Sequence, residues 1–349
     1  MMKSVCLALT AVLLFLNSAA SARTFIVSNS ADDISPASLR GAIMAANARG
    51  GENTIILQTN VQVSLGTLVV TKGRLTIRSK HSASIDASSF QAGALAVFCI
   101  LPRTQVKMEN LIIMGGGGSG GGINNAGDLH LRSCNISNNF SFMGGGGLLN
   151  SGNLLMENCR VQGNATAAGR NPLSGRVFTG VAPGLNGFDG VSGGGIFNSG
   201  TMILLNTLIS DNTCGSGGAG ADGFGVGGSG GNGGHGAGIY NVGIMLLYRC
   251  VVENNTAGDG GGGGIGLPGP YGPPYNPQNF PIACGDGGKG GSGGGICNAA
   301  DASSAILIHS SVTSNSSGVG GPSGGAGGVD GADGLGADVF GDVTFSNRR

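Results

Sequence analysis

Acidic side chains are the first place to look for catalysis in this sequence. Hydrolysis of a glycosidic bond needs two carboxylates that flank the bond, and lyase chemistry needs clustered acids that hold Ca²⁺ beside a basic residue. The acids on strand-like segments are Glu109, Asp128, Glu157 and Glu253. No two neighbouring regular repeats place a carboxylate at the same outward position. This pattern therefore does not favour catalysis by paired acids.

Two glycine-rich segments carry other groups for catalysis or metal binding. His235 stands between two glycines and is a candidate catalytic imidazole, and the alternative is a histidine in a loop. Residues 217–225 fit a calcium-binding nonapeptide whose acid is Asp222, and residues 184–192 approach this motif around Asp189. Single matches are common in a chain with 73 glycines, so the alternative is a solvated loop. Apart from calcium at these two acids, we expect no cofactor.

The basic residues include one group with strand spacing. Lys+Arg and Asp+Glu number 18 each, so the formal net charge is zero and no global field favours nucleic acid. Alternation places four cations on one face of a strand: Lys72, Arg74, Arg78 and Lys80. This stripe predicts contact with an anionic glycan, and a solvated outer face is the alternative.

A repeat must position all of these residues. Five segments share a frame of glycines, an apolar residue and an asparagine, and a second asparagine follows at one constant separation in four of them and slightly later in the fifth. The two columns are Asn125, Asn150, Asn198, Asn241 and Asn298, then Asn139, Asn164, Asn212, Asn255 and Asn315. Asparagine tolerates the left-handed region at bends, and stacked amides can hydrogen-bond from one repeat to the next. We therefore predict two structural ladders.

Between the two asparagines, apolar residues are spaced by two, three and two positions, as in Leu129, Leu131, Cys134 and Ile136. This spacing predicts two short strands with a turn between them, and the apolar residue before the first asparagine predicts a third strand. Three strands and three turns form one coil. The sequence thus predicts an all-β fold, a right-handed parallel β-helix of about eight coils with an N-terminal capping helix.

The chain divides into a signal peptide and one domain. Residues 1–22 combine a basic start, a short apolar run and a small-residue cleavage site. Residues 23–349 form the domain, with an N-terminal cap at 23–52, irregular coils at 53–114 and regular coils at 115–349. A helix is expected at 35–50 with Ser35 as its N-cap. Glycine-rich inserts interrupt the regular coils at 165–192, 213–235 and 256–292. We expect export, to the extracellular space or cell surface, and no transmembrane segment.

Seven cysteines follow the signal peptide. Cys134 and Cys159 share an inward column that continues with Thr207 and Cys250, where a cysteine is expected to behave as a small apolar residue. Two cysteines in inserts, at 214 and 284, are the better disulfide candidates.

Several segments resemble the secreted parallel β-helix proteins of bacteria. Residues 25–33 (FIVSNSADD), 38–47 (SLRGAIMAAN) and 54–57 (TIIL) are similar to the N-terminal module of that family, which carries an S-L-R-x-A-I-x-x-A-N motif. The alternation of V-x-x-N-x-x with G-G-G-I resembles the repeats of the chlamydial polymorphic outer-membrane proteins. The resemblance implies a pectin-lyase-like fold, export and an adhesin-like role. Gly234-His235-Gly236 also resembles the Gly-His-Gly of polygalacturonases, whose other motifs are missing from the expected strands.

The outward positions of the first strand in each repeat form an apolar stripe. They are His130, Leu155, Ile203, Leu246 and Ile306. Either the inserts fold over this stripe, or a partner or a second copy of the chain lies along it. We therefore expect a secreted or cell-surface protein, adhesin-like and non-enzymatic, that binds a glycan or a protein surface. The alternative is a polysaccharide lyase or glycoside hydrolase that acts on acidic glycans.

Overall fold

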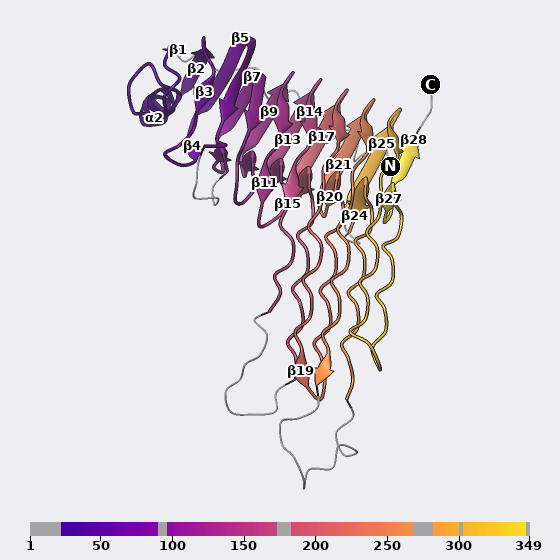
Figure 1. The fold of residues 1–349 in the computed structure, drawn as a ribbon. Helices are drawn as coiled ribbons and strands as arrows, with labels where there is room; N and C mark the ends of the chain where they lie inside the picture. Colours follow the sequence, from indigo (N-terminus) through magenta and orange to yellow (C-terminus); the bar gives the residue numbers. More distant parts are fainter. Residues whose placement is uncertain (1–21, 90–95, 173–182, 268–281, 300–302, 347–349) are drawn as a thin grey trace.

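The computed structural model describes residues 22–89, 96–172, 183–267, 282–299 and 303–346. They form a right-handed parallel β-helix with helix α2 (Leu39–Arg49) at its N-terminal end (Figure 1). The strands pair in parallel along both main sheets. The predicted fold class is thus confirmed. Among the residues that the structure describes, no helix has the length and apolarity needed to span a membrane.

The longer sheet has 16 strands. Its path runs β26-β22-β18-β14-β10-β7-β9-β13-β17-β21-β25-β28, and β1, β2, β3 and β5 join it through the pairing of β5 with β7. The bounds are β1 (Arg23–Val27), β2 (Glu52–Leu57), β3 (Val61–Gln62), β5 (Arg74–Asp86), β7 (Gln105–Met114), β9 (Asp128–Arg132), β10 (Asn135–Ser137), β13 (Asn153–Glu157), β14 (Arg160–Gln162), β17 (Thr201–Leu205), β18 (Leu208–Ser210), β21 (Ile244–Tyr248), β22 (Val251–Glu253), β25 (Ser304–Ile308), β26 (Ser311–Thr313) and β28 (Thr344–Ser346).

A second sheet closes the other side of the coils. It has eight strands, in the order β27-β24-β20-β16-β12-β8-β6-β4. The bounds are β4 (Leu68–Val70), β6 (Phe98–Ile100), β8 (Ile123–Asn125), β12 (Leu148–Asn150), β16 (Ile196–Asn198), β20 (Ile239–Asn241), β24 (Ile296–Asn298) and β27 (Val339–Phe340). Two short pairs complete the structure: β11 (Phe140–Ser141) with β15 (Ala165–Thr166), and β19 (Gly223–Phe224) with β23 (Gly266–Leu267).

Inward side chains of successive coils stack in register and make one continuous core. Leu129, Leu154, Met202 and Met245 are aligned by the pairing of neighbouring strands, and each is at most 3% exposed. Neighbouring strands lie about 4.8 Å apart, so each side chain packs against its equivalents above and below. The apolar spacing in the sequence therefore determines which side chains point inward and stack along the axis of the solenoid.

Both asparagine ladders run through the core at the bends of the coils. In the first, the side-chain Nδ2 of Asn125, Asn150, Asn198 and Asn241 each donates to Oδ1 of the next asparagine at 2.7 Å. In the second, the corresponding distances between Asn139 and Asn315 are 2.8–3.0 Å. All ten side chains are buried. Because each amide both donates and accepts, the ladders satisfy polar groups that the coil buries.

A third ladder occupies the turn between the two strands of each regular coil. The first residue of the turn has positive φ, and the next carries a thiol or hydroxyl group. That group donates to the backbone carbonyl two residues earlier in Cys134, Cys159, Thr207, Cys250 and Ser310. The cysteines in this column therefore act as hydrogen-bond donors as well as small buried side chains.

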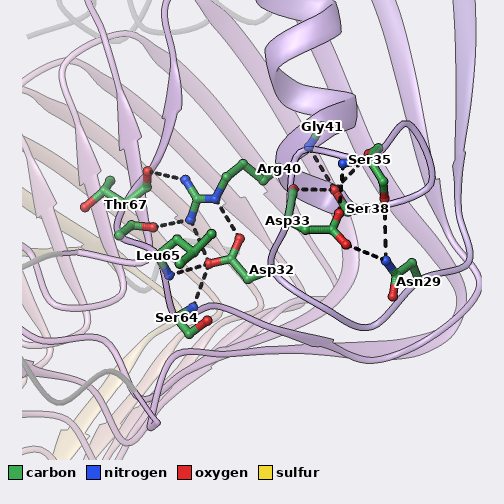
Figure 2. A network of polar contacts seen from close by, with 11 residues as sticks. Asn29, Asp32, Asp33, Ser35, Ser38, Arg40, Gly41, Ser64, Leu65 and Thr67 are labelled. Carbon is green, nitrogen blue, oxygen red and sulfur yellow. Dashed lines mark hydrogen bonds and ion pairs between the residues drawn. The ribbon is translucent and has the colours of Figure 1, made fainter.

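Helix α2 covers the open end of the first coils, and its entry is fixed by polar contacts (Figure 2). The N-cap is Ser38, whose Oγ accepts the N–H of Gly41 at 3.0 Å, so the prediction of Ser35 was wrong. Ser35 lies in the preceding turn, where its N–H donates to Asp33. Asp32 forms an ion pair with Arg40 at 2.6 Å and also accepts the backbone N–H of Leu65 at 2.6 Å, which ties the cap to the first coils.

The inserts form a separate structure beside the coils, which consists of two layers of extended arms. The chain leaves and returns to the coils four times, in outgoing arms 165–172, 213–224, 256–267 and 316–324 and returning arms 183–192, 226–236, 282–293 and 327–336. Figure 1 shows these arms running side by side away from the coils. We call them the glycine sandwich. The sequence indicated three inserts and read them as loops; the fourth pair of arms was not predicted.

Hydrogen bonds in the glycine sandwich repeat every three residues, the period of a polyproline II helix. Within the outgoing layer, Gly217 and Gly220 donate to the next arm at 2.7 and 2.8 Å. Between layers, Gly218 donates to Phe188 and Gly231 donates to Gly218, both at 2.8 Å. Each inner arm therefore bonds to neighbours on both sides and in the facing layer.

Close packing between arms explains the glycine content. A Cβ atom on Gly261 would lie 2.0 Å from the carbonyl oxygen of Gly218, whereas a Cβ on Gly262 would meet nothing closer than 3.6 Å. Two positions of each three-residue turn face other arms, and the third faces outward. Only the outward position tolerates a side chain in an inner arm.

The outer edges of the glycine sandwich are closed in two different ways. Leu185 and Phe188, in the first returning arm, occupy the position that is glycine in the next returning arm, and their side chains are 61% and 62% exposed. They fill the place of a further arm. At the last edge, Asp330 and Asp333 accept the N–H groups of Ser323 and Gly320 at 2.7 and 2.8 Å. These donors would otherwise need another arm.

Candidate functional site

The outer face of the longer sheet divides into a charged part and an apolar part. Along one outward column, Lys107 and His130 of the early coils are followed by Leu155, Ile203, Leu246 and Ile306. In the adjacent column, Arg78, Glu109, Arg132 and Glu157 are followed by Leu205, Tyr248 and Ile308. Parallel register stacks each column, so the division follows directly from the sequence.

The charged part contains one ion pair and one histidine–glutamate contact, on either side of an arginine. Nζ of Lys107 lies 2.7 Å from Oε1 of Glu109, and Nε2 of His130 lies 3.3 Å from Oε2 of Glu157. Arg132 is exposed and stands between the two glutamates in their column. We call these five residues the charged cluster.

The protonation of the charged cluster follows from these contacts. The hydrogen bond from Lys107 holds the pKa of Glu109 below its usual value. Burial lowers the pKa of His130, although the Glu157 carboxylate opposes this effect. Glu109 is therefore a poor general acid, because an acid catalyst needs a raised pKa.

The two glutamates lie two strand spacings apart, about 9.6 Å between backbones, with Arg132 between them. This pair is not evident from adjacent regular repeats, because Glu109 belongs to an irregular coil and Glu157 lies two coils further on.

Only three of the four residues of the predicted cation stripe lie on a strand. Arg74, Arg78 and Lys80 lie at outward positions of β5, but Lys72 precedes the strand, which begins at Arg74. Arg74 pairs with Glu52 at 3.6 Å, and Arg78 is in register with Glu109. Carboxylates thus accompany the cations, and the face is mixed in charge rather than basic.

The predicted apolar stripe is present as an uninterrupted column. Leu155, Ile203, Leu246 and Ile306 are in register on consecutive coils, and each is half-buried. The described parts of the inserts run away from the longer sheet as the glycine sandwich (Figure 1). They do not fold over the stripe.

The remaining candidates lie on outward positions of the glycine sandwich. Nδ1 of His235 accepts the N–H of Ser292 at 2.8 Å, which requires a neutral ring, and burial lowers the pKa of His235. Asp189 and Asp222 lie in different layers, and each accepts a backbone N–H, at 2.6 and 2.8 Å. Among the described residues, no three His, Cys, Asp or Glu side chains gather as a metal site. Calcium binding at these acids stays a prediction.

No protein-family model and no curated protein matches the chain. One solved structure that matches is ORF18 of Geobacillus virus E2, with 13% sequence identity and a TM-score of 0.29. The match covers 80% of this chain and 62% of the phage chain, less than two thirds of its length. The class that fold and site define is a parallel β-helix with an attached glycine sandwich.

Proposed function

We propose that the protein is an exported binding protein of the cell surface or extracellular space, adhesin-like, and that it binds a glycan or a protein surface. The apolar stripe carries this proposal. Leu155, Ile203, Leu246 and Ile306 form one column on the outer face, and the described inserts extend away from it. Contiguous apolar side chains on an outer face mark contact surfaces.

The charged cluster extends this binding face. Arg132 is exposed beside two carboxylates, and a guanidinium group can hold a ligand carboxylate or paired hydroxyls through two parallel hydrogen bonds. A ligand lying along the solenoid axis would meet polar groups on the early coils and apolar side chains on the later ones. The glycine sandwich, which is hydrogen-bonded throughout its described length, supports the role of an extended, rigid surface protein.

Replacement of Ile203 and Leu246 by glutamate tests the proposal. Binding to a panel of glycans and to host-cell surfaces should be lost while the melting temperature stays within a few degrees of wild type. Ile244→Glu is the matched control, because Ile244 is 54% exposed on the same strand as Leu246 but in another column. Loss of binding in the control, or early unfolding of the double variant, would count against the stripe as a contact surface.

A second candidate function is cleavage of an acidic glycan, which the charged cluster favours. It brings Glu109 and Glu157 together with a lysine, a histidine and an arginine on outward strand positions. Incubation with polyuronates and plant glycans, followed by assay for new reducing or unsaturated ends, tests this candidate. Product formed by wild type but not by Glu157→Gln would replace the binding proposal with an enzyme.

A further inference from the structure

Two stacked thiols lie beneath the charged cluster. Cys134 and Cys159 follow Arg132 and Glu157 by two residues, and the Sγ of each cysteine donates to the carbonyl of that residue, at 3.4 and 3.3 Å. Both cysteines are free and only 2% exposed. They occupy the same position of the turn on consecutive coils.

The geometry of the pair is close to that of a disulfide. Asn135 and Arg160, the next residues, are partners in a parallel ladder, so the two cysteine Cα atoms are about 4.8 Å apart. Disulfides span Cα separations of roughly 4.4–6.8 Å. The backbone N–H of Cys134 also points at Sγ of Cys159, at 3.4 Å. The contact with Cys134 lowers the pKa of Cys159, the property of an attacking thiol.

We propose that Cys134 and Cys159 are a redox-active pair that closes to a disulfide between adjacent coils in the presence of a small-molecule or protein disulfide. The proposal rests on the exported location in the proposed function, since reducing compartments would keep the thiols free. The Cys159 thiolate attacks the external disulfide and releases one thiolate. Cys134, after losing its proton to solvent, then attacks the Cys159 sulfur and releases the second thiolate. Two cysteine thiols are oxidised, and one external disulfide is reduced to two thiols.

Oxidation of this cysteine pair would affect the charged cluster on the binding face. Oxidation removes both S–H donors from the carbonyls of Arg132 and Glu157, whose side chains belong to the charged cluster. Because the thiols are buried, the reaction should run while the coils are open during folding and be slow in the closed solenoid.

The same column of the turn provides two controls. Thr207 takes this position on the next coil and donates through Oγ1 to Leu205 at 3.0 Å, so Cys159→Thr should keep the ladder. Cys250 is equally enclosed, but its neighbours in the column are Thr207 and Ser310. It has no thiol partner in the column and should remain reduced and free.

The test is refolding of the whole chain in oxidised and reduced glutathione, with peptide mass spectrometry without reductant. We expect a cross-linked peptide that joins Cys134 to Cys159, free Cys250, and a melting temperature that rises by a few degrees and falls again with dithiothreitol. Cys159→Thr should fold and show no such response. Free thiols at both positions after oxidative refolding, or a different pairing, would overturn the proposal. Glycan-binding assays do not enter this test, so its failure is distinct from failure of the proposed function.

Discussion

Two adjacent glycines of the third outgoing arm provide a sharp test of the glycine sandwich. A Cβ atom on Gly261 would lie 2.0 Å from the Gly218 oxygen, well inside ordinary van der Waals contact, so the two arms would have to move apart. This movement would break the two bonds that join these arms on either side of Gly261, from Gly217 to Asp259 at 2.7 Å and from Gly220 to Gly262 at 2.8 Å. Each buried group left unpaired costs about 1–3 kcal/mol, so Gly261→Ala should destabilise by about 2–4 kcal/mol.

Gly262→Ala is the control for this substitution. Its Cβ would make only ordinary van der Waals contact, with Pro322 at 3.6 Å, and alanine restricts the unfolded chain, so we expect a change between zero and about 1 kcal/mol of stabilisation. Denaturant unfolding gives both values, and hydrogen exchange of the arm amides shows whether the loss is local to the sandwich. Equal effects of the two substitutions would refute the close packing of the arms.

Three further predictions concern the ladders and the edges. Asn212→Ala removes an amide that makes ladder bonds in both directions, and unfolding in denaturant should show a loss of about 3–5 kcal/mol; a loss below about 1 kcal/mol would contradict the ladder. Because the pKa of His235 is lowered from 6.5, the unfolded chain takes up the proton first, so stability should be full above about pH 6.5 and fall as the pH drops from there through the lowered pKa. His235→Asn, which keeps an acceptor for Ser292, should flatten this curve, and an unchanged curve would count against the hydrogen bond. Replacing Leu185 and Phe188 by glycine should open the first edge of the sandwich and produce self-association in sedimentation velocity, whereas a strictly monomeric variant would show that these side chains do not close it.

The sequence predicted the coils because their side chains repeat. Asn198 and Asn212 keep the separation of the asparagine pairs before them, and the apolar positions between them alternate, so the ladders and strands could be placed from spacing alone. Such patterns show which side chains point inward and which point outward, and this information is enough to specify a solenoid coil. The charged cluster was not predicted from the sequence, because its two glutamates lie two coils apart.

The glycine sandwich could not be predicted in the same way. Its arms have no apolar alternation, and hydrogen-bond partners such as Gly217 and Asp259 belong to different inserts, with a whole coil of the solenoid between them in the sequence. A run of glycines on its own is typical of a loop, because its unfolded entropy is large. Only the stacking of the coils brings four such runs into contact, so the arms depend on the fold that the repeats specify.

The period of three imposes a rule on how this protein can change length. A polyproline II turn of three residues advances about 9 Å, and glycine donors such as Gly217 and Gly220 meet carbonyls of the next arm at that interval. An insertion of three residues in one arm alone would leave a turn without partners. The same insertion in every outgoing and returning arm would move the tip about 9 Å further from the coils with all bonds kept. The length of the glycine sandwich can therefore change only in steps of one three-residue turn. A longer or shorter version must change all of its inserts together.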